Sequence, residues 1–221
     1  MRIEMILVIF AALMLSSCGN YYNEENENLD AQGNNQKTLA LDDEFTKDFI
    51  ASDQEVVEGY YLFKSHTDGY TVHFPINASM DKAVYERVGN QFESVGFVEN
   101  DEIQNLSFIY NIYYDDQPRA NDIEFKLDMF DTYIDYKGDF KDYIRNRITY
   151  YYAEDKFEFE GKESSLYFSY IKPPLENKGI QFIGSVLCID YEKPCKQDSK
   201  EAKEKVLNIM HSIDVKSRIV N

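Results

Sequence analysis

Two pairs of side chains have a spacing known from covalent catalysis. Ser79 with Lys82 and Ser169 with Lys172 each form a Ser-x-x-Lys pair, the spacing of an acyl-enzyme nucleophile and its base. The Ser-Asp-Asn and Lys-Thr-Gly motifs that accompany such a pair are absent from the sequence. A chain rich in Ser and Lys contains such pairs by chance, so we assign no catalytic residue to them.

Carboxylates are the remaining route to catalysis. Glu158, Glu160 and Asp190 are candidates for the acid and base of a hydrolase. No spacing in the sequence singles them out, so they support only an alternative interpretation, an exported carboxylate-dependent hydrolase of envelope material. A non-enzymatic role is the favoured interpretation.

The residues that bind metals do not occur in a metal-binding pattern. The chain has three histidines, His66, His73 and His211, and none lies at ligand spacing from another. Acids recur at Asp128, Asp131, Asp135, Asp139 and Asp142. They do not follow the EF-hand spacing and are better explained as a solvated helix face. The sequence predicts no metal and no cofactor.

The N-terminus has the pattern of an export signal. Residues 5–15 are an unbroken apolar run, which is shorter than the roughly 20 residues that span a bilayer. The run ends in Leu15-Ser16-Ser17-Cys18, which resembles a bacterial lipobox. The resemblance implies that residues 1–17 are a lipoprotein signal peptide and that Cys18 is the lipid attachment site, diacylated before cleavage.

Such an anchor fixes the location of the protein. Two acyl chains, palmitate among them, give stable membrane attachment, whereas one chain gives only marginal binding. The expected partner is therefore the membrane, which the protein contacts through its lipid anchor. We expect it on the extracytoplasmic face of the cell membrane, with the outer membrane as an alternative in a two-membrane cell.

The other two cysteines, Cys188 and Cys195, form an even pair in an exported chain. An even pair outside the cytosol predicts a disulfide. Pro194 helps the chain to turn back between them. The alternative is a buried Cys188 with a free thiol at Cys195, since unpaired cysteines are often buried.

The charge of the chain limits its partners. The formal net charge is −17 at pH 7. Nucleic-acid phosphates require Lys and Arg, so nucleic acid is excluded as a partner. An envelope protein or a glycan remains as a possible partner. The predicted strands are rich in tyrosine. Outward-facing tyrosines would form a stacking surface for such a partner, whereas inward-facing ones would supply the aromatic core of a chain that has no Trp.

Composition divides the chain after the signal peptide into two parts. Residues 18–45 are acidic, rich in amides and without apolar periodicity, which predicts a disordered tether. Residues 46–221 form a single domain, and a short helix over residues 44–52 is expected at the boundary. The length suits one sizeable domain.

The patterns within the domain predict both helices and strands. Alternating or β-branched runs predict strands over residues 60–64, 70–75, 106–114, 148–152, 165–171 and 179–191. Residues 79–100 fit a helix or a hairpin, and strands are favoured. Apolar spacing predicts helices over residues 122–136, 140–148 and 198–213, the last with a capping box of Asp198 and Glu201. The fold class is α+β, a mostly antiparallel sheet flanked by helices, with a closing C-terminal helix.

Two short segments of the domain resemble those of PsbP-like α/β/α domains. They are Gly69-Tyr-Thr-Val-His-Phe-Pro75 and Val206-Leu-Asn-Ile-Met-His-Ser-Ile-Asp-Val215. The resemblance spans about residues 58–216 and implies a last strand after the closing helix. Members of that fold are mainly accessory and binding proteins. The predicted function is therefore a membrane-anchored lipoprotein that serves as a binding or accessory module at the cell envelope.

Overall fold

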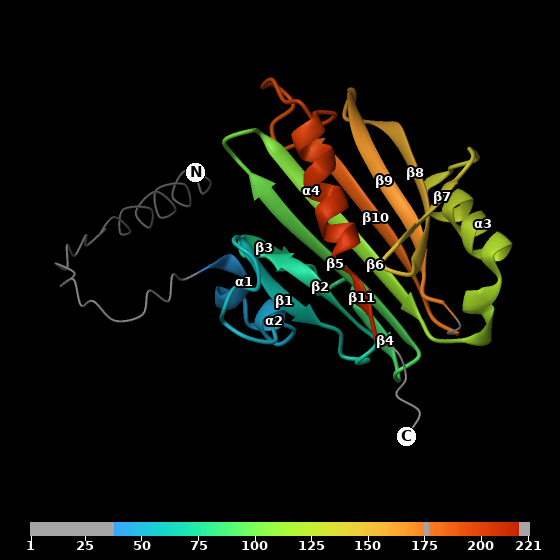
Figure 1. Cartoon of the computed structure of the whole chain (residues 1–221). Coiled ribbons are helices and arrows are strands. Elements are labelled where there is room, and N and C mark those ends of the chain that lie inside the picture. The colour runs from blue at the N-terminus through green and yellow to red at the C-terminus, as the bar shows by residue number, and fades with distance from the viewer. Residues whose placement is uncertain (1–37, 175–176, 217–221) are drawn as a thin grey trace, which may run out of the picture. The chain divides into compact units, whose positions relative to one another are not determined.

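The computed structural model describes residues 38–174 and 177–216 (Figure 1). These residues belong to one compact unit that begins at Lys37. The predicted signal peptide, the lipobox with Cys18 and most of the predicted tether lie outside the described residues.

Two antiparallel sheets form the body of this unit (Figure 1). The small sheet has the order β1-β2-β11, and the large sheet has the order β3-β5-β6-β10-β9-β8-β7, with β4 paired to β5. The small sheet consists of β1 (Tyr60–Lys64), β2 (Tyr70–Pro75) and β11 (Asp214–Val215). The large sheet consists of β3 (Ala78–Met80), β4 (Glu86–Val88), β5 (Phe92–Asp101), β6 (Leu106–Asp115), β7 (Lys141–Arg145), β8 (Ile148–Phe159), β9 (Lys162–Lys172) and β10 (Gly179–Cys188). The predicted α+β class is confirmed.

The first face of the large sheet is covered by the small sheet and by α4 (Lys200–His211). Side chains on a strand alternate between the two faces of the sheet. An added Cβ at Gly184 of β10 would meet Val206 of α4, so even-numbered residues of β10 face the helix. The aromatic rings of Phe74 on β2 and Phe97 on β5 lie 4.8 Å apart and join the two sheets. Apolar burial on this face supplies the main core.

Helix α3 (Ile123–Ile134) packs on the second face of the large sheet. The ring of its Phe130 lies 5.2 Å from that of Phe168 on β9, and Tyr133 stacks on Tyr113 of β6 at 5.5 Å. These contacts lie at one end of the sheet. The odd-numbered residues of β10 after Ile183, which are Ser185 and Leu187, therefore lie on the part of this face that α3 does not cover.

The folded unit begins before the predicted boundary at residue 46. Two short helices, α1 (Leu39–Asp42) and α2 (Glu44–Lys47), replace the single helix expected over residues 44–52. The side chain of Ala40 is fully buried, and its backbone N–H donates to the carbonyl of Ile76 at 3.1 Å. The acidic composition of residues 38–45 concealed these few anchoring contacts.

The helix expected over residues 140–148 is wrong. Residues 141–145 form strand β7, which pairs with β8, and Asn146 and Arg147 make the turn with positive φ angles of 50° and 70°. Turns with two positive φ angles usually carry Gly at the second position. Because Arg147 occupies that position, the sequence lacks the usual sign of a hairpin. A 3₁₀ turn, η1 (Pro118–Asn121), precedes α3.

One smaller prediction also needs correction. The N-cap of α4 is Ser199, whose hydroxyl accepts from the backbone N–H of Ala202 at 3.1 Å, so the expected capping box with Asp198 is wrong. Of the two interpretations of the strand tyrosines, the aromatic core is confirmed for most of them. The buried strand tyrosines are Tyr61, Tyr70, Tyr110, Tyr114, Tyr150, Tyr167 and Tyr170.

We predict that Gly184 is required for the close packing of α4. Gly184→Ala places a methyl group against Val206 and should lower the free energy of unfolding by about 1–3 kcal/mol, the usual cost of overpacking. In a Val206→Ala background the same change should cost less, because the space is then free. Urea unfolding of the two single variants and the double variant measures the coupling. Strictly additive losses would contradict this account of the contact.

Candidate functional site

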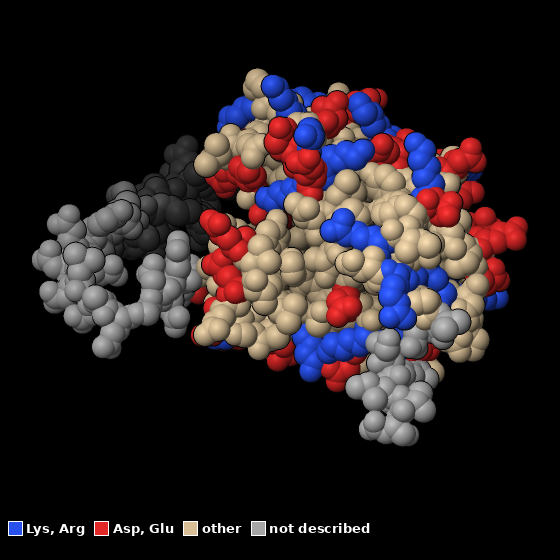
Figure 2. All heavy atoms as spheres, in the orientation of Figure 1, with Lys and Arg blue, Asp and Glu red and all other residues tan. Residues whose placement is uncertain are grey.

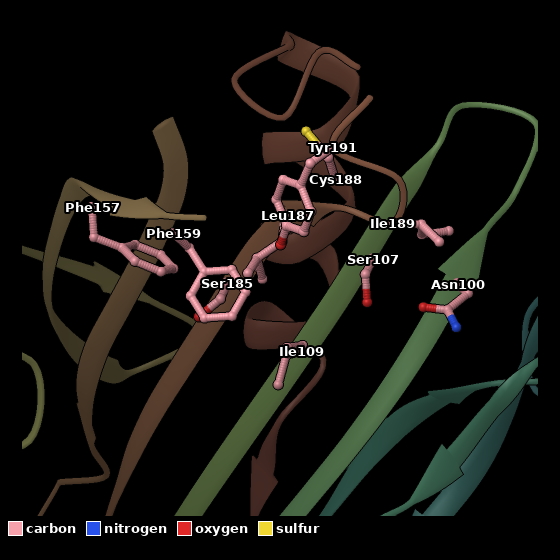
Figure 3. A pocket seen from close by; sticks show the side chains of 10 residues that line it. All are labelled: Asn100, Ser107, Ile109, Phe157, Phe159, Ser185, Leu187, Cys188, Ile189 and Tyr191. Carbon is pink, nitrogen blue, oxygen red and sulfur yellow. The ribbon is translucent and has the colours of Figure 1, made fainter. Parts of the chain in front are cut away.

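The part of the second face that α3 leaves open is hollowed into a cavity of about 510 Å³ (Figure 3). We call it the sheet groove. Its lining residues come from β5, β6, β8, β10 and the loop after β10. They are Asn100, Ser107, Ile109, Phe157, Phe159, Ser185, Leu187, Cys188, Ile189 and Tyr191.

Strands β6 and β10 form the floor of the sheet groove. Ser185 pairs with Ile109, and Leu187 pairs with Ser107. These are odd-numbered residues, so their side chains point away from α4. Figure 3 shows them side by side between Phe159 and Asn100. The alternation along the two strands thus places hydroxyl and aliphatic groups together on the floor.

The walls come from β8 and from the loop after β10. Phe157 and Phe159 lie on the β8 side, and Ile189 and Asn100 lie on the other side (Figure 3). The ring of Phe159 lies 5.9 Å from that of Tyr191, so the aromatic wall joins the loop. The side chain of Phe159 is 45% exposed, which leaves its ring available to a ligand.

Two connections hold the loop in place. Cys188 and Cys195 form a disulfide with their Cα atoms 5.9 Å apart, as the sequence predicts. Asn105 accepts the backbone N–H of Asp190 at 2.8 Å and donates to the Asp190 carbonyl at 2.9 Å. The loop is therefore fixed at both ends of its turn. No pattern in the sequence indicated the role of Asn105.

A second hollow of about 400 Å³ shares Phe157 and Ser185 with the sheet groove. It extends toward α3, where Tyr113 stacks on Tyr133. Its other lining residues are Asn111, Ile134, Leu166 and Ile183. The two hollows together give an elongated recess along the open face.

The recess is lined by uncharged side chains, although the chain has a net charge of −17. Burial raises the pKa of Tyr113, and burial with the charge of Glu160 raises the pKa of Tyr191. Both hydroxyls therefore remain protonated at neutral pH. By contrast, acidic and basic side chains are interspersed over α4 on the face seen in Figure 2.

The three candidate carboxylates do not line the sheet groove. Glu158 is an exposed residue of β8, and Glu160 is exposed in the turn that follows. Asp190 pairs with Lys193 at 3.0 Å, and that contact lowers the pKa of its carboxyl group. A general acid requires a raised pKa, so this shift has the wrong direction for that role.

The other candidate residues lie apart from the recess. Ser169 is fully buried in β9, and Ser79 lies on β3 at the far edge of the sheet. His66 lies beside Asp48, with 3.4 Å between Nε2 and a carboxylate oxygen. Within residues 38–174 and 177–216, no three His, Cys, Asp or Glu side chains are arranged to hold a metal ion. No helix in the same ranges is long and apolar enough to cross a membrane.

Comparisons with known proteins place the chain among lipoproteins. A curated protein of Bacillus subtilis (strain 168), named "Putative lipoprotein YvcA", is 30% identical over 181 residues, which cover 79% of this chain and 75% of that protein. A crystal structure from Bacteroides thetaiotaomicron VPI-5482 has a TM-score of 0.48 and 13% sequence identity, and the match covers 73% of this chain and 50% of that one.

A family model described as "Putative lipoprotein YvcA" matches residues 36–214, nearly all of the folded unit. The match includes every strand and helix that builds the recess. This chain therefore belongs to the YvcA lipoprotein family.

Proposed function

We propose that this protein is a lipid-anchored binding module of the cell envelope and that the sheet groove is its binding site. The acyl chains on Cys18 hold it to the extracytoplasmic face of a membrane. The residues between Cys18 and Lys37 connect that anchor to the folded unit. The protein acts by binding an envelope component.

The proposed anchor is supported by two independent observations. The chain belongs to a family of lipoproteins, and Leu15-Ser16-Ser17-Cys18 resembles a lipobox at the end of an apolar run. Two acyl chains attach a protein stably to a bilayer. Together these observations favour lipidation of Cys18 over any other use of this cysteine.

The uncharged lining of the recess is the observation that carries the binding role. Although the chain has 40 acidic residues, none of the described residues that line the recess is charged. Concave sites of this volume, lined by aromatic and aliphatic groups with a few polar groups, are typical of ligand binding. Phe157 and Phe159 provide apolar contact area, and Asn100 and Ser107 provide hydrogen bonds. The ligand is therefore an uncharged segment with an apolar face, such as a sugar ring or a peptide.

We predict that Cys18→Ser abolishes lipid anchoring. The variant should appear as unprocessed precursor or as protein without acyl chains, because serine offers no thiol for acylation. Fractionation of cells followed by mass analysis of the N-terminal peptide measures both outcomes. Wild-type protein that is soluble without detergent and carries an unmodified Cys18 would refute the anchor.

We also predict that the sheet groove binds uncharged apolar probes. Phe159→Ser should weaken binding of the uncharged dye Nile red about tenfold, because the variant loses part of an aromatic contact. Val88→Ser is the matched control, since Val88 is 55% exposed on β4, outside the recess. Fluorescence titration of both variants gives the affinities. Equal weakening by the control substitution would show that the dye binds to exposed apolar residues in general.

A further inference from the structure

A second cavity, of about 240 Å³, lies where β2, β7 and the end of α4 meet. We call it the basic cavity. It is distinct from the recess and has a different chemistry. Its lining residues are Val57, Tyr60, His73, Arg145, Asn208, His211 and Ser212.

The fold brings the basic residues together from separate elements. His73 lies on β2, Arg145 ends β7, and His211 ends α4. The backbone N–H of His73 donates to the Ser212 hydroxyl at 3.0 Å, which fixes β2 against the helix end. The hydroxyl of Tyr143 on β7 lies 2.8 Å from Nε2 of His211. The cavity is therefore built by contacts that hold its walls in place.

The lining contains three residues able to carry positive charge and no carboxylate. In the described part of the chain, Arg145 has no carboxylate partner at ion-pair distance. Two acids lie nearby, and neither lines the cavity. Glu99 pairs with Lys205 at 2.8 Å, and burial together with its charge raises the pKa of Tyr60. The charge of Asp214 contributes to the raised pKa of Tyr150, which is caused mainly by burial.

Both histidines titrate below the usual range. Burial lowers the pKa of His73, and burial with the charge of Arg145 lowers the pKa of His211. The groups that face them are Tyr60, beside His73, and Tyr143, Tyr150 and Arg145, around His211. A bound anion would oppose these effects and favour the protonated rings. The carbonyls at the C-terminus of α4 repel an anion, but that effect is small beside an Arg and two protonated His.

We propose that the basic cavity binds an oxyanion of the phosphate class, with Arg145, His73 and His211 as its ligands. The guanidinium group offers a planar fork of donors that matches phosphate oxygens. The amide of Asn208 supplies a further donor. The same chemistry occurs in free phosphate and in the headgroups of phospholipids.

The first test measures phosphate binding through the two histidines. NMR titration of the Cys18→Ser chain with inorganic phosphate, at constant ionic strength, should show saturable shifts of the His73 and His211 ring signals. Arg145→Gln should weaken the affinity at least about tenfold, because a charge-assisted contact is lost. Arg147→Gln is the matched control, since it removes the same charge from the same β7–β8 hairpin, and Arg147 does not line the cavity. It should leave the affinity unchanged.

The second test uses pH and sulfate, whose charge is constant over the range. Sulfate binding should raise both histidine pKa values, so its affinity should fall as the pH rises from about 6 to about 8. Absence of saturable shifts, or equal weakening by the Arg145 and Arg147 substitutions, would overturn the proposal. Equal weakening would mean that the anion is attracted by the general surface charge and not by the cavity.

A final arm identifies the source of the phosphate group. Vesicles of phosphatidylcholine with phosphatidylglycerol are added to the Cys18→Ser chain, which lacks the acyl anchor. Vesicles that displace bound phosphate from the wild-type cavity, but not from the Arg145→Gln variant, indicate a lipid headgroup. Displacement only by free phosphate or sulfate indicates a soluble anion. Both results support the oxyanion site and separate its two sources.

Discussion

The alternation of side chains along β6 and β10 is the constraint on which the rest of the structure depends. It gives the large sheet two apolar faces, and apolar surface is stabilising only where it is removed from water. The first face is covered by α4 and the small sheet, with Gly184 allowing the helix to approach. Among the described elements, only α3 packs on the second face, and it covers one end of that face. The sheet groove is the uncovered remainder.

The walls give this uncovered remainder the concave shape on which the proposed binding role rests. Phe157, Phe159 and Tyr191 line the groove, which stays open to solvent. Exposed apolar patches of this kind often mark interaction sites. The disulfide and Asn105 hold the loop that carries Tyr191. Ordering the loop in advance lowers the entropic cost of binding a ligand. The structural disulfide and the proposed binding role are thus connected through one loop.

Much of the fold could be predicted from local sequence patterns. The aromatic and β-branched run over residues 106–114 predicted β6, and the apolar spacing over residues 122–136 predicted α3. The last strand implied by the PsbP-like segments is present as β11, while the resemblance itself stays a prediction. Strand β7 was missed because its turn uses Asn146 and Arg147 without glycine.

The sites could not be predicted, because they depend on contacts between distant segments. The sheet groove exists because α3 covers one end of a face and not the other, and helix length alone does not determine that placement. The disulfide of Cys188 and Cys195 was an exception. It could be predicted because these two cysteines form an even pair in a chain expected to be exported to an oxidising compartment. No sequence pattern connects His73 and His211, which lie far apart in the chain. The fold places the end of α4 beside β2, and both histidines therefore line one cavity.

The central claim, that the sheet groove is where this lipoprotein binds its envelope component, is tested most directly by methyl NMR. The Cys18→Ser chain, labelled at Ile, Leu and Val methyl groups, is titrated with fractionated envelope extract. The account predicts that Ile109, Leu187 and Ile189 shift first, while Val206 and Ile209 on the buried side of α4 do not change. Saturable shifts confined to other surfaces, with the groove methyl groups unchanged, would contradict it.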